Sequence, residues 1–256
     1  MAEFLTTERH DNGVELIRFN RPPLNALSIE LLTELGDHVE ALAGDADLKA
    51  IVLAGNDRTF AAGAEISQIQ SSHDQLLGAF RRAFDGLEAI PRPVIAAISG
   101  FALGGGCEAA LACDLRVAGE NARLGVPEVL LGAIPGAGGT QRLARMIGAA
   151  KTKELIWSGR QVRAAEALEL GLVDRVVPSE SCLDAALEWA ASLASSAVVA
   201  IGLAKQAVNG GLDVSLAEGL DLERRLFEQL LDTEDLATGI ASFFENGPGK
   251  ATFSGR

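Results

Sequence analysis

The chain has 256 residues, which at about 100–200 residues per domain allows one large domain or two small ones. Hydrophobic residues make up 48% and charged residues 22%, a globular composition that excludes a disordered chain. The net charge of −13 argues against a nucleic acid as the main partner, because phosphate backbones bind positive surfaces. Three cysteines without a CxxC spacing favour a reducing compartment, so we expect a cytoplasmic protein. We expect no signal peptide, no transmembrane helix and no membrane partner.

Hydrophobic spacing predicts a body in which strands and helices alternate. Strand, turn, helix and strand at these intervals favour a parallel or mixed sheet, and the chain is nearly all helical from about residue 180. We therefore expect an α/β body over residues 1–195 and a helical region over 196–256. The expected elements are a half-buried strand at 14–19, a helix at 28–44 capped by Ser28, buried strands at 50–55, 93–98 and 115–118, a helix at 73–89, and C-terminal helices at 180–195, 197–209, 215–232 and 234–245.

Three glycine-rich segments, at 60–66, 100–108 and 127–140, stand out from this pattern. The first two follow strands and begin helices, where small residues let a ligand approach free backbone N–H groups. A single such segment is more often a plain tight turn, but three together favour a site of backbone donors. No Walker A sequence, dinucleotide fingerprint or nucleophile elbow is present.

Acid–base chemistry in this sequence depends on carboxylates, because the three histidines lack metal spacing and no Ser–His or Cys–His arrangement is evident. Glu108 and Glu128 are each a lone charge in an apolar stretch. Burial there raises the pKa of a carboxyl toward the range useful for proton transfer. Each could instead be a helix-start carboxylate or one half of a buried ion pair.

These segments resemble the enoyl-CoA hydratase/isomerase (crotonase) family over nearly the whole chain. The matching stretches are NRPPLNAL (20–27), FAAGAEI (60–66), PVIAAISGFALGGGCEAALACDLRVA (93–118), GVPEVLLGAIPGAGGTQRLARMIG (125–148) and SGRQVRAAEALELGLVDRVVP (158–178). The resemblance implies a spiral of repeated ββα units with C-terminal helices that assemble a homotrimer or a dimer of trimers. It also implies an enoyl-CoA hydratase, which reversibly adds water to 2-enoyl-CoA thioesters in fatty-acid β-oxidation or related acyl-CoA catabolism.

The resemblance also assigns roles to residues of this chain. The oxyanion-hole amides fall on Ala64 and Gly105, the catalytic glutamates on Glu108 and Glu128, and a water-positioning amide on Gly136. No metal or other cofactor is implied, since CoA is part of the substrate. Contacts to the CoA thioester are implied for Arg21, Pro23, Leu24, Ala26, Ala62, Ala64, Ile66 and Gly105, with Lys250 as a candidate partner of a CoA phosphate.

Two departures from the family pattern affect only the CoA contacts. Ser67 stands where many members carry Lys or Arg, and the C-terminal segment lacks a continuous basic run. A Δ3,Δ2-enoyl-CoA isomerase remains an alternative, although two glutamates favour hydration. More distant alternatives are a non-catalytic acyl-CoA-binding protein and an RNA-binding relative. The RNA-binding function would need a basic patch, and the nearest features, Arg81-Arg82 and Arg224-Arg225, adjoin acidic residues.

Overall fold

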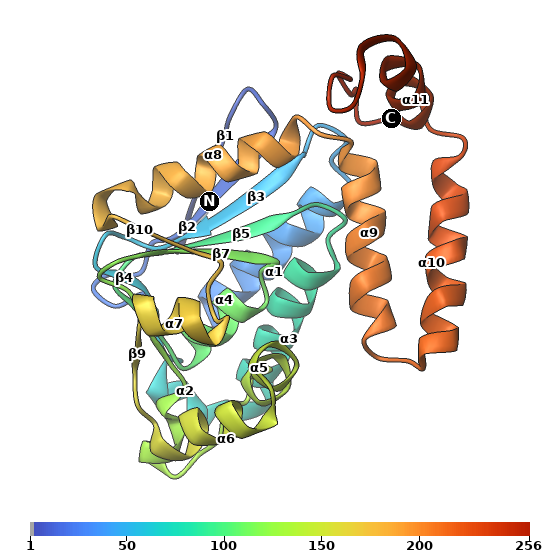
Figure 1. The fold of residues 1–256 in the computed structure, drawn as a ribbon. Coiled ribbons are helices and arrows are strands. Elements are labelled where there is room, and N and C mark those ends of the chain that lie inside the picture. Colours follow the sequence, from blue (N-terminus) through green and yellow to red (C-terminus); the bar gives the residue numbers. More distant parts are fainter. Residues whose placement is uncertain (1–2) are drawn as a thin grey trace.

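Two β-sheets form the body of the protein in the computed structural model, which describes residues 3–256 (Figure 1). The larger sheet has the order β1-β2-β3-β5-β7-β10 and the smaller one β4-β6-β8-β9. Neighbouring strands are parallel except in the pairs β1–β2 and β8–β9. The strands are β1 (Leu5–Arg9), β2 (Val14–Phe19), β3 (Ala50–Ala54), β4 (Thr59–Ala62), β5 (Val94–Ile98), β6 (Phe101–Leu103), β7 (Leu115–Gly119), β8 (Arg123–Gly125), β9 (Val162–Arg163) and β10 (Arg175–Val177).

The order of the strands along the chain makes a spiral. Each of the pairs β3–β4, β5–β6 and β7–β8 places its first strand in the larger sheet and its second in the smaller sheet. Helical segments follow each pair. After the first two pairs they return the chain directly to the larger sheet, and after β7–β8 the chain passes through β9 of the smaller sheet before it reaches β10. This confirms the predicted spiral of ββα units, and it stacks the starts of these helical segments beside the smaller sheet.

Helices cover both faces of the larger sheet (Figure 1). Helix α8 packs on β3, β5 and β7, while α1, α3 and α4 enclose the main core on the other side. Ser28 caps α1, since its hydroxyl accepts the N–H of Leu31 at 3.3 Å. The helices are α1 (Ile29–Ala43), α2 (Ile66–Ser71), α3 (His73–Ala89), α4 (Gly105–Leu111), α5 (Gly139–Ile147), α6 (Ala149–Ser158), α7 (Ala164–Leu170), α8 (Cys182–Ala194), α9 (Val198–Gly211), α10 (Leu216–Leu230) and α11 (Glu234–Asn246), with 3₁₀ turns η1 (Pro127–Leu131) and η2 (Ser179–Ser181).

The prediction of a half-buried strand at 14–19 was wrong. Every residue of β2 except Arg18 is buried, because α8 covers the face of Val14 and Leu16 while the main core covers the face of Ile17 and Phe19. Glu15 is buried with its charge paired, 2.6 Å from Arg9 Nε and 3.0 Å from His38 Nε2. The other predicted strands and the predicted helices are present within a few residues of their expected bounds.

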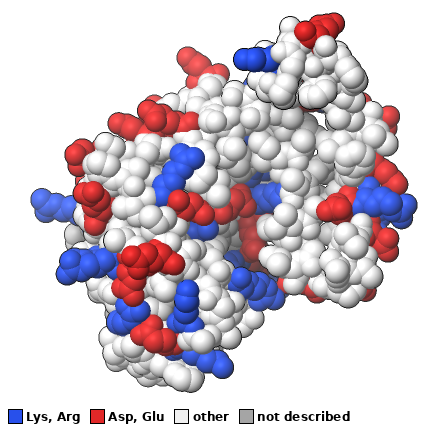
Figure 2. Space-filling model, viewed as in Figure 1, with Lys and Arg blue, Asp and Glu red and all other residues white. Residues whose placement is uncertain are grey.

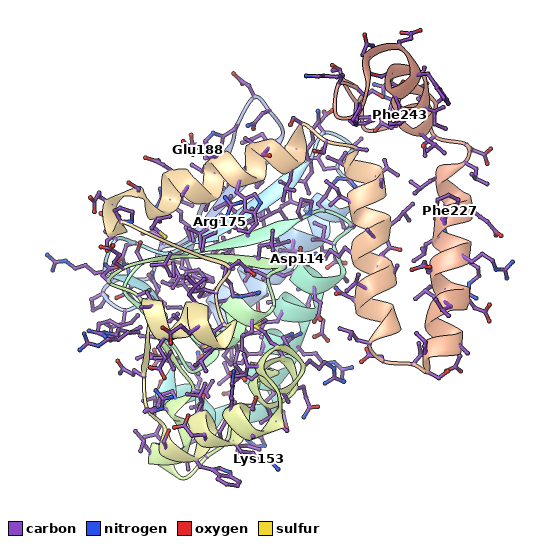
Figure 3. The ribbon with its side chains drawn as sticks, in the orientation of Figure 1. Asp114, Lys153, Arg175, Glu188, Phe227 and Phe243 are labelled. Atoms are coloured by element: carbon purple, nitrogen blue, oxygen red, sulfur yellow. The ribbon has the colours of Figure 1, made fainter. Side chains whose placement is uncertain are left out.

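Helix α9 attaches the C-terminal helices to the body, and α10 and α11 extend beyond it (Figure 1). The ammonium group of Lys205 on α9 donates to Asp114 Oδ2 at 2.8 Å and to the carbonyls of Leu87 and Arg92. Figure 3 shows Asp114 on the body, and Phe227 and Phe243 on the extended helices. The predicted division at residue 195 falls in the turn before α9.

Acidic and basic side chains alternate over the face shown in Figure 2, with no continuous basic area on it. Within residues 3–256 no single helix is long and apolar enough to cross a membrane. The segments 179–194 and 198–211 reach that length and composition only when they are counted together across a bend of 104°.

Replacing Gly106 by Ala tests the close approach of α4 to β4. A Cβ at Gly106 would lie 1.9 Å from the carbonyl oxygen of Ala61, and neither backbone can move freely. We expect a loss of about 1–3 kcal/mol in the free energy of unfolding. Gly78→Ala on α3 is the matched control, because its Cβ would meet nothing within 4 Å and alanine favours a helix. Denaturant unfolding of both variants makes the measurement, and a Gly106→Ala variant as stable as Gly78→Ala would contradict this packing.

Candidate active site

A cavity of about 470 Å³ lies beside the smaller sheet, between α2–α3 on one side and η1 with its following loop on the other. The structure brings Ala64, Gly105, Glu108 and Glu128 together in its lining, and Gly136 lies there too. All three glycine-rich segments found in the sequence therefore contribute to one site. Their joint placement follows from the spiral, which stacks successive strand ends next to each other.

Glu108 is held by two backbone donors from the third glycine-rich segment. It lies on α4 with 2% of its surface exposed, and its Oε1 accepts the N–H groups of Ala137 and Gly139, both at 2.8 Å. A Cβ at Gly139 would lie 3.0 Å from this same oxygen. Glycine at 139 thus lets the backbone come close enough to fix the carboxylate. The GAGG run at 136–139 marks these two donors, which we did not predict from the sequence.

Glu128 reaches the cavity from η1 without comparable hydrogen bonds. Among the described residues its Oε2 is buried and has no hydrogen-bond partner. A Cβ at Gly104 would lie 2.9 Å from Oε1 of Glu128, and Gly104 has a φ of +54° that favours glycine. The second glycine-rich segment therefore makes room for the second carboxyl group.

Burial raises the pKa of both glutamates. Desolvation raises the pKa of Glu108, while the N–H donors at 139 and 137 and the charge of Arg142 work in the opposite direction. Desolvation, with a smaller contribution from the charge of Glu108, raises the pKa of Glu128 to about 7. Two carboxylates that share a cavity resist double ionisation, so the pair retains a proton near neutral pH.

The N–H groups of Ala64 and Gly105 are free to meet a ligand. The N–H of Leu27 donates to the carbonyl of Gly63, and the carbonyl of Leu27 accepts the N–H of Glu65, both at 2.9 Å. These two bonds form a parallel β-bridge between Leu27 and Ala64, in which the N–H of Ala64 points away from Leu27. Gly105 begins α4, where the first N–H groups have no partner within the helix. Within residues 3–256 neither of these two N–H groups has a hydrogen-bond acceptor.

The residues implied for CoA contacts fall into two sets. Segments 21–27 and 62–66 lie side by side, because Ala62 donates to the Leu24 carbonyl at 3.0 Å and Arg21 pairs with Glu65 at 2.8 Å. Lys250 belongs to the segment after α11, and Figure 1 places that segment far from α2 and α4 of the same chain. The structure thus brings together Arg21, Pro23, Leu24, Ala26, Ala62, Ala64, Ile66 and Gly105, but not Lys250.

Asn25 holds the turn at 21–27 in place, and we did not single it out from the sequence. It is 1% exposed, and its side-chain amide donates to the carbonyls of Thr59 and Phe60 at 3.2 and 3.1 Å. Its Oδ1 accepts the N–H of Arg21 at 3.0 Å. These bonds fix the 21–27 turn to β4. The three cysteines are buried and unpaired, and among residues 3–256 no cluster of three His, Cys, Asp or Glu side chains could hold a metal ion.

Comparisons with known proteins agree with this architecture. The family described as Enoyl-CoA hydratase/isomerase matches residues 9–256. A probable enoyl-CoA hydratase of Rhizobium meliloti is 48% identical over 90% of this chain and 91% of its own length. The mitochondrial enoyl-CoA hydratase of Pongo abelii is 41% identical over 95% of this chain and 86% of its own. The crystal structure of an enoyl-CoA hydratase from Bacillus anthracis superposes with a TM-score of 0.94 at 38% identity, covering 99% of this chain and all of the other. The chain therefore belongs to the enoyl-CoA hydratase/isomerase family.

Replacing Glu128 by Gln should stabilise the protein at neutral and alkaline pH. The pKa of Glu128 is about 7 in the folded state and 4.5 ordinarily. The folded state therefore becomes less stable relative to the unfolded state as the pH rises from 4.5 through 7. Glutamine keeps the shape but carries no charge, so the Tm of the variant relative to the unmodified protein should increase from pH 5.5 to pH 8. Thermal melts at both pH values make the measurement. A difference that stays constant or shrinks would contradict the burial of an ionisable group at 128.

Proposed function

We propose that this protein is an enoyl-CoA hydratase, which adds water across the 2,3 double bond of a 2-enoyl-CoA thioester to give a 3-hydroxyacyl-CoA. The observation that carries the proposal is a cavity whose lining combines two carboxyl groups of raised pKa with two backbone N–H groups that have no acceptor within residues 3–256. The names of the relatives support the same reaction. Every group that the reaction requires comes from the chain itself, so the mechanism needs no other cofactor.

The N–H groups of Ala64 and Gly105 act as the oxyanion hole. Addition of water at C3 moves the π electrons of the double bond toward C2 and the thioester oxygen, which becomes enolate-like. Preorganised donors at that oxygen stabilise the transition state more than the ground state. Because both donors are backbone groups fixed by the Leu27 bridge and the start of α4, they need no rearrangement during the reaction.

The two glutamates divide the proton transfers. Glu108, whose ionised form the donors at 137 and 139 favour, takes a proton from the attacking water as its oxygen bonds to C3. Glu128, whose Oε2 has no donor among residues 3–256 to stabilise a charge, is protonated and delivers its proton to C2. Exchange of one proton between the two carboxyl groups restores the starting state. The amide of Gly136, in the same lining, helps to position the water.

Isomerisation of a 3-enoyl-CoA would pass through the same enolate and needs only one carboxylate to move a proton. A Bacillus subtilis relative, 44% identical, is named a putative enoyl-CoA hydratase/isomerase. Hydration also needs a base that activates water, and Glu108 has that role in this proposal. Isomerisation has no such step. Hydration is therefore the main activity in this proposal.

The turn at 21–26, with segment 62–66, holds the CoA part of the substrate.

Turnover assays on crotonyl-CoA test whether both glutamates take part in the reaction. Glu108→Gln and Glu128→Gln should each lower kcat by roughly 10²–10⁴-fold, the usual contribution of a general acid or base. Loss of the enoyl-thioester absorbance measures the reaction. Glu188→Gln is the control, because Glu188 lies on the exposed side of α8, outside the cavity lining (Figure 3). If either active-site variant hydrates as fast as Glu188→Gln, the role given to that residue is wrong.

The C-terminal helices also support a proposal about assembly. Helices α10 and α11 extend from the body and expose large apolar side chains, among them Leu216 at 79% and Phe244 at 81%. Such a surface is costly in water, and contact between copies would cover it. We infer a homotrimer or a dimer of trimers. Lys250, remote from its own cavity, could reach a phosphate of CoA only in such an assembly.

Sedimentation equilibrium at micromolar concentration should give a mass of three or six chains. Replacing Phe227, which is 58% exposed on α10, by Asp should shift the mass toward that of one chain, because a charge would be buried in the contact. Leu168→Asp on the body, 45% exposed, should leave the mass unchanged. A single-chain mass for the unmodified protein would refute the assembly.

A further inference from the structure

Arg142, in the first turn of α5, binds the same backbone segment that holds Glu108. Its Nη1 donates to the carbonyl of Ala137 at 3.0 Å, and its backbone N–H donates to the carbonyl of Gly138 at 2.8 Å. The side chain is only 15% exposed. One residue therefore binds two consecutive carbonyl groups of this segment, once through its side chain and once through its backbone.

These two bonds fix the peptide groups next to the donors of Glu108. The carbonyl of Gly138 belongs to the same peptide group as the N–H of Gly139, which donates to Glu108 Oε1 at 2.8 Å. The carbonyl of Ala137 belongs to the preceding peptide group, and the N–H of Ala137 is the other donor, also at 2.8 Å. Because a peptide group is planar, a hydrogen bond to its oxygen also restricts the direction of its N–H. Arg142 thus restricts one donor directly and holds the residue that carries the other.

Glycine at 138 lets the guanidinium group reach this position. A Cβ at Gly138 would lie 2.0 Å from Nη1 of Arg142, so a side chain at 138 would displace the guanidinium group. Gly138 also has a φ of +108°, which favours glycine. The neighbouring Gly139 makes room for Glu108 in the same way. The two adjacent glycines therefore admit two different charged groups to one stretch of backbone.

Two carboxylates near the end of α3 hold the other edge of the guanidinium group. Nε and Nη2 donate to Oε2 of Glu88 at 3.1 and 2.6 Å, and Nη2 donates to Oδ1 of Asp85 at 3.3 Å. Earlier turns of α3 place Leu77 and Phe80 in the lining of the catalytic cavity. Arg142 therefore links the backbone that holds Glu108 to a helix that lines the same cavity.

We propose that Arg142 is a positioning residue for the reaction, because it holds the donors at 137 and 139 in the direction of Glu108 and so keeps this carboxylate able to take a proton from water. The inference rests on the proposed function, which makes Glu108 the base. Arg142 lines a second cavity, between the body and α9, and does not belong to the lining of the catalytic cavity. It acts through the backbone and not by contact with the substrate.

The positive charge of Arg142 should also affect the pH dependence of the reaction. Burial raises the pKa of Glu108, while its N–H donors and the charge of Arg142 lower it. Without that charge, Glu108 should bind a proton at a higher pH. The other charged side chains that face Arg142 or share the second cavity with it, and that stay when only Arg142 is changed, are Asp85, Glu88, Asp114, Arg116, Arg145 and Lys205.

Hydration of crotonyl-CoA by Arg142→Gln and Arg145→Gln tests the proposal. Both changes remove one positive charge from α5, but Arg145 bonds to Gln141 and Asp213 instead of to the backbone at 137–139. Arg142→Gln should lower kcat by roughly tenfold to a hundredfold, the cost of a misplaced catalytic group, and leave KM about unchanged. The acid limb of its kcat/KM profile should lie at higher pH. Arg145→Gln should match the unmodified protein in all three respects.

Two further variants separate positioning from folding, which thermal melts monitor. Arg142→Lys keeps the charge but lacks the planar guanidinium fork, so it should restore the acid limb and only part of kcat. Glu88→Gln, at a side chain 43% exposed, loosens the guanidinium group without burying anything new and should lower kcat by roughly threefold. It replaces Arg142→Gln as the test if that variant does not fold, and an unchanged kcat in Glu88→Gln would then overturn the proposal.

The remaining outcomes are equally direct. A folded Arg142→Gln variant that hydrates as fast as Arg145→Gln would overturn the proposal, and so would a loss of kcat without any shift of the acid limb, which is the result of a merely structural role. Absence of hydration in the unmodified protein would instead refute the proposed function, and infrared titration would then decide the positioning role. In a Glu128→Gln background, Glu108 is the remaining carboxyl group of the catalytic cavity. Adding Arg142→Gln should raise the pH at which its protonated carbonyl band is lost, and an equal midpoint after adding Arg145→Gln would overturn the proposal.

Discussion

The site depends above all on the pair of hydrogen bonds that the backbone at 137 and 139 donates to Oε1 of Glu108. They join α4 to the loop after η1 and to the start of α5, and the two donors lie 29 and 31 residues from Glu108 in the chain. A carboxylate that is 2% exposed would be costly without donors, so the loop must hold this geometry for the helix to carry a usable charge. Glycine at 139 is required for the same reason, since a side chain would meet the carboxylate.

The second carboxyl group lies in a contrasting environment within the same cavity. Oε2 of Glu128 has no hydrogen-bond partner among residues 3–256, and burial raises its pKa to about 7. Two carboxyl groups with unequal hydrogen bonding can divide the roles of base and acid at neutral pH, because the N–H donors at 137 and 139 reduce the cost of a charge on Glu108, while Oε2 of Glu128 has no donor among residues 3–256. The N–H groups of Ala64 and Gly105, which have no acceptor within residues 3–256, lie in the lining of the same cavity.

Much of this site could be predicted from residue types and their surroundings. Glu108 and Glu128 stood out as lone charges in apolar segments, and the glycine-rich runs marked where backbone donors would lie. The smaller sheet could not be foreseen, because β6 and β8 have three residues each and pair only across the spiral. The burial of β2 could not be foreseen either, because it depends on α8, which lies more than 160 residues further along the chain. The hydration roles and the CoA contacts came from the family resemblance.

We propose that the shared proton of the pair resides on Glu128 while Glu108 is ionised. Infrared difference spectroscopy between pH 6 and pH 9 measures this directly, because a protonated carboxyl group has a carbonyl band that a carboxylate lacks. We expect one such band in the unmodified protein, lost with a midpoint near pH 7, kept in Glu108→Gln and absent from Glu128→Gln. A band that survives in Glu128→Gln and disappears in Glu108→Gln would place the proton on Glu108 and overturn this assignment.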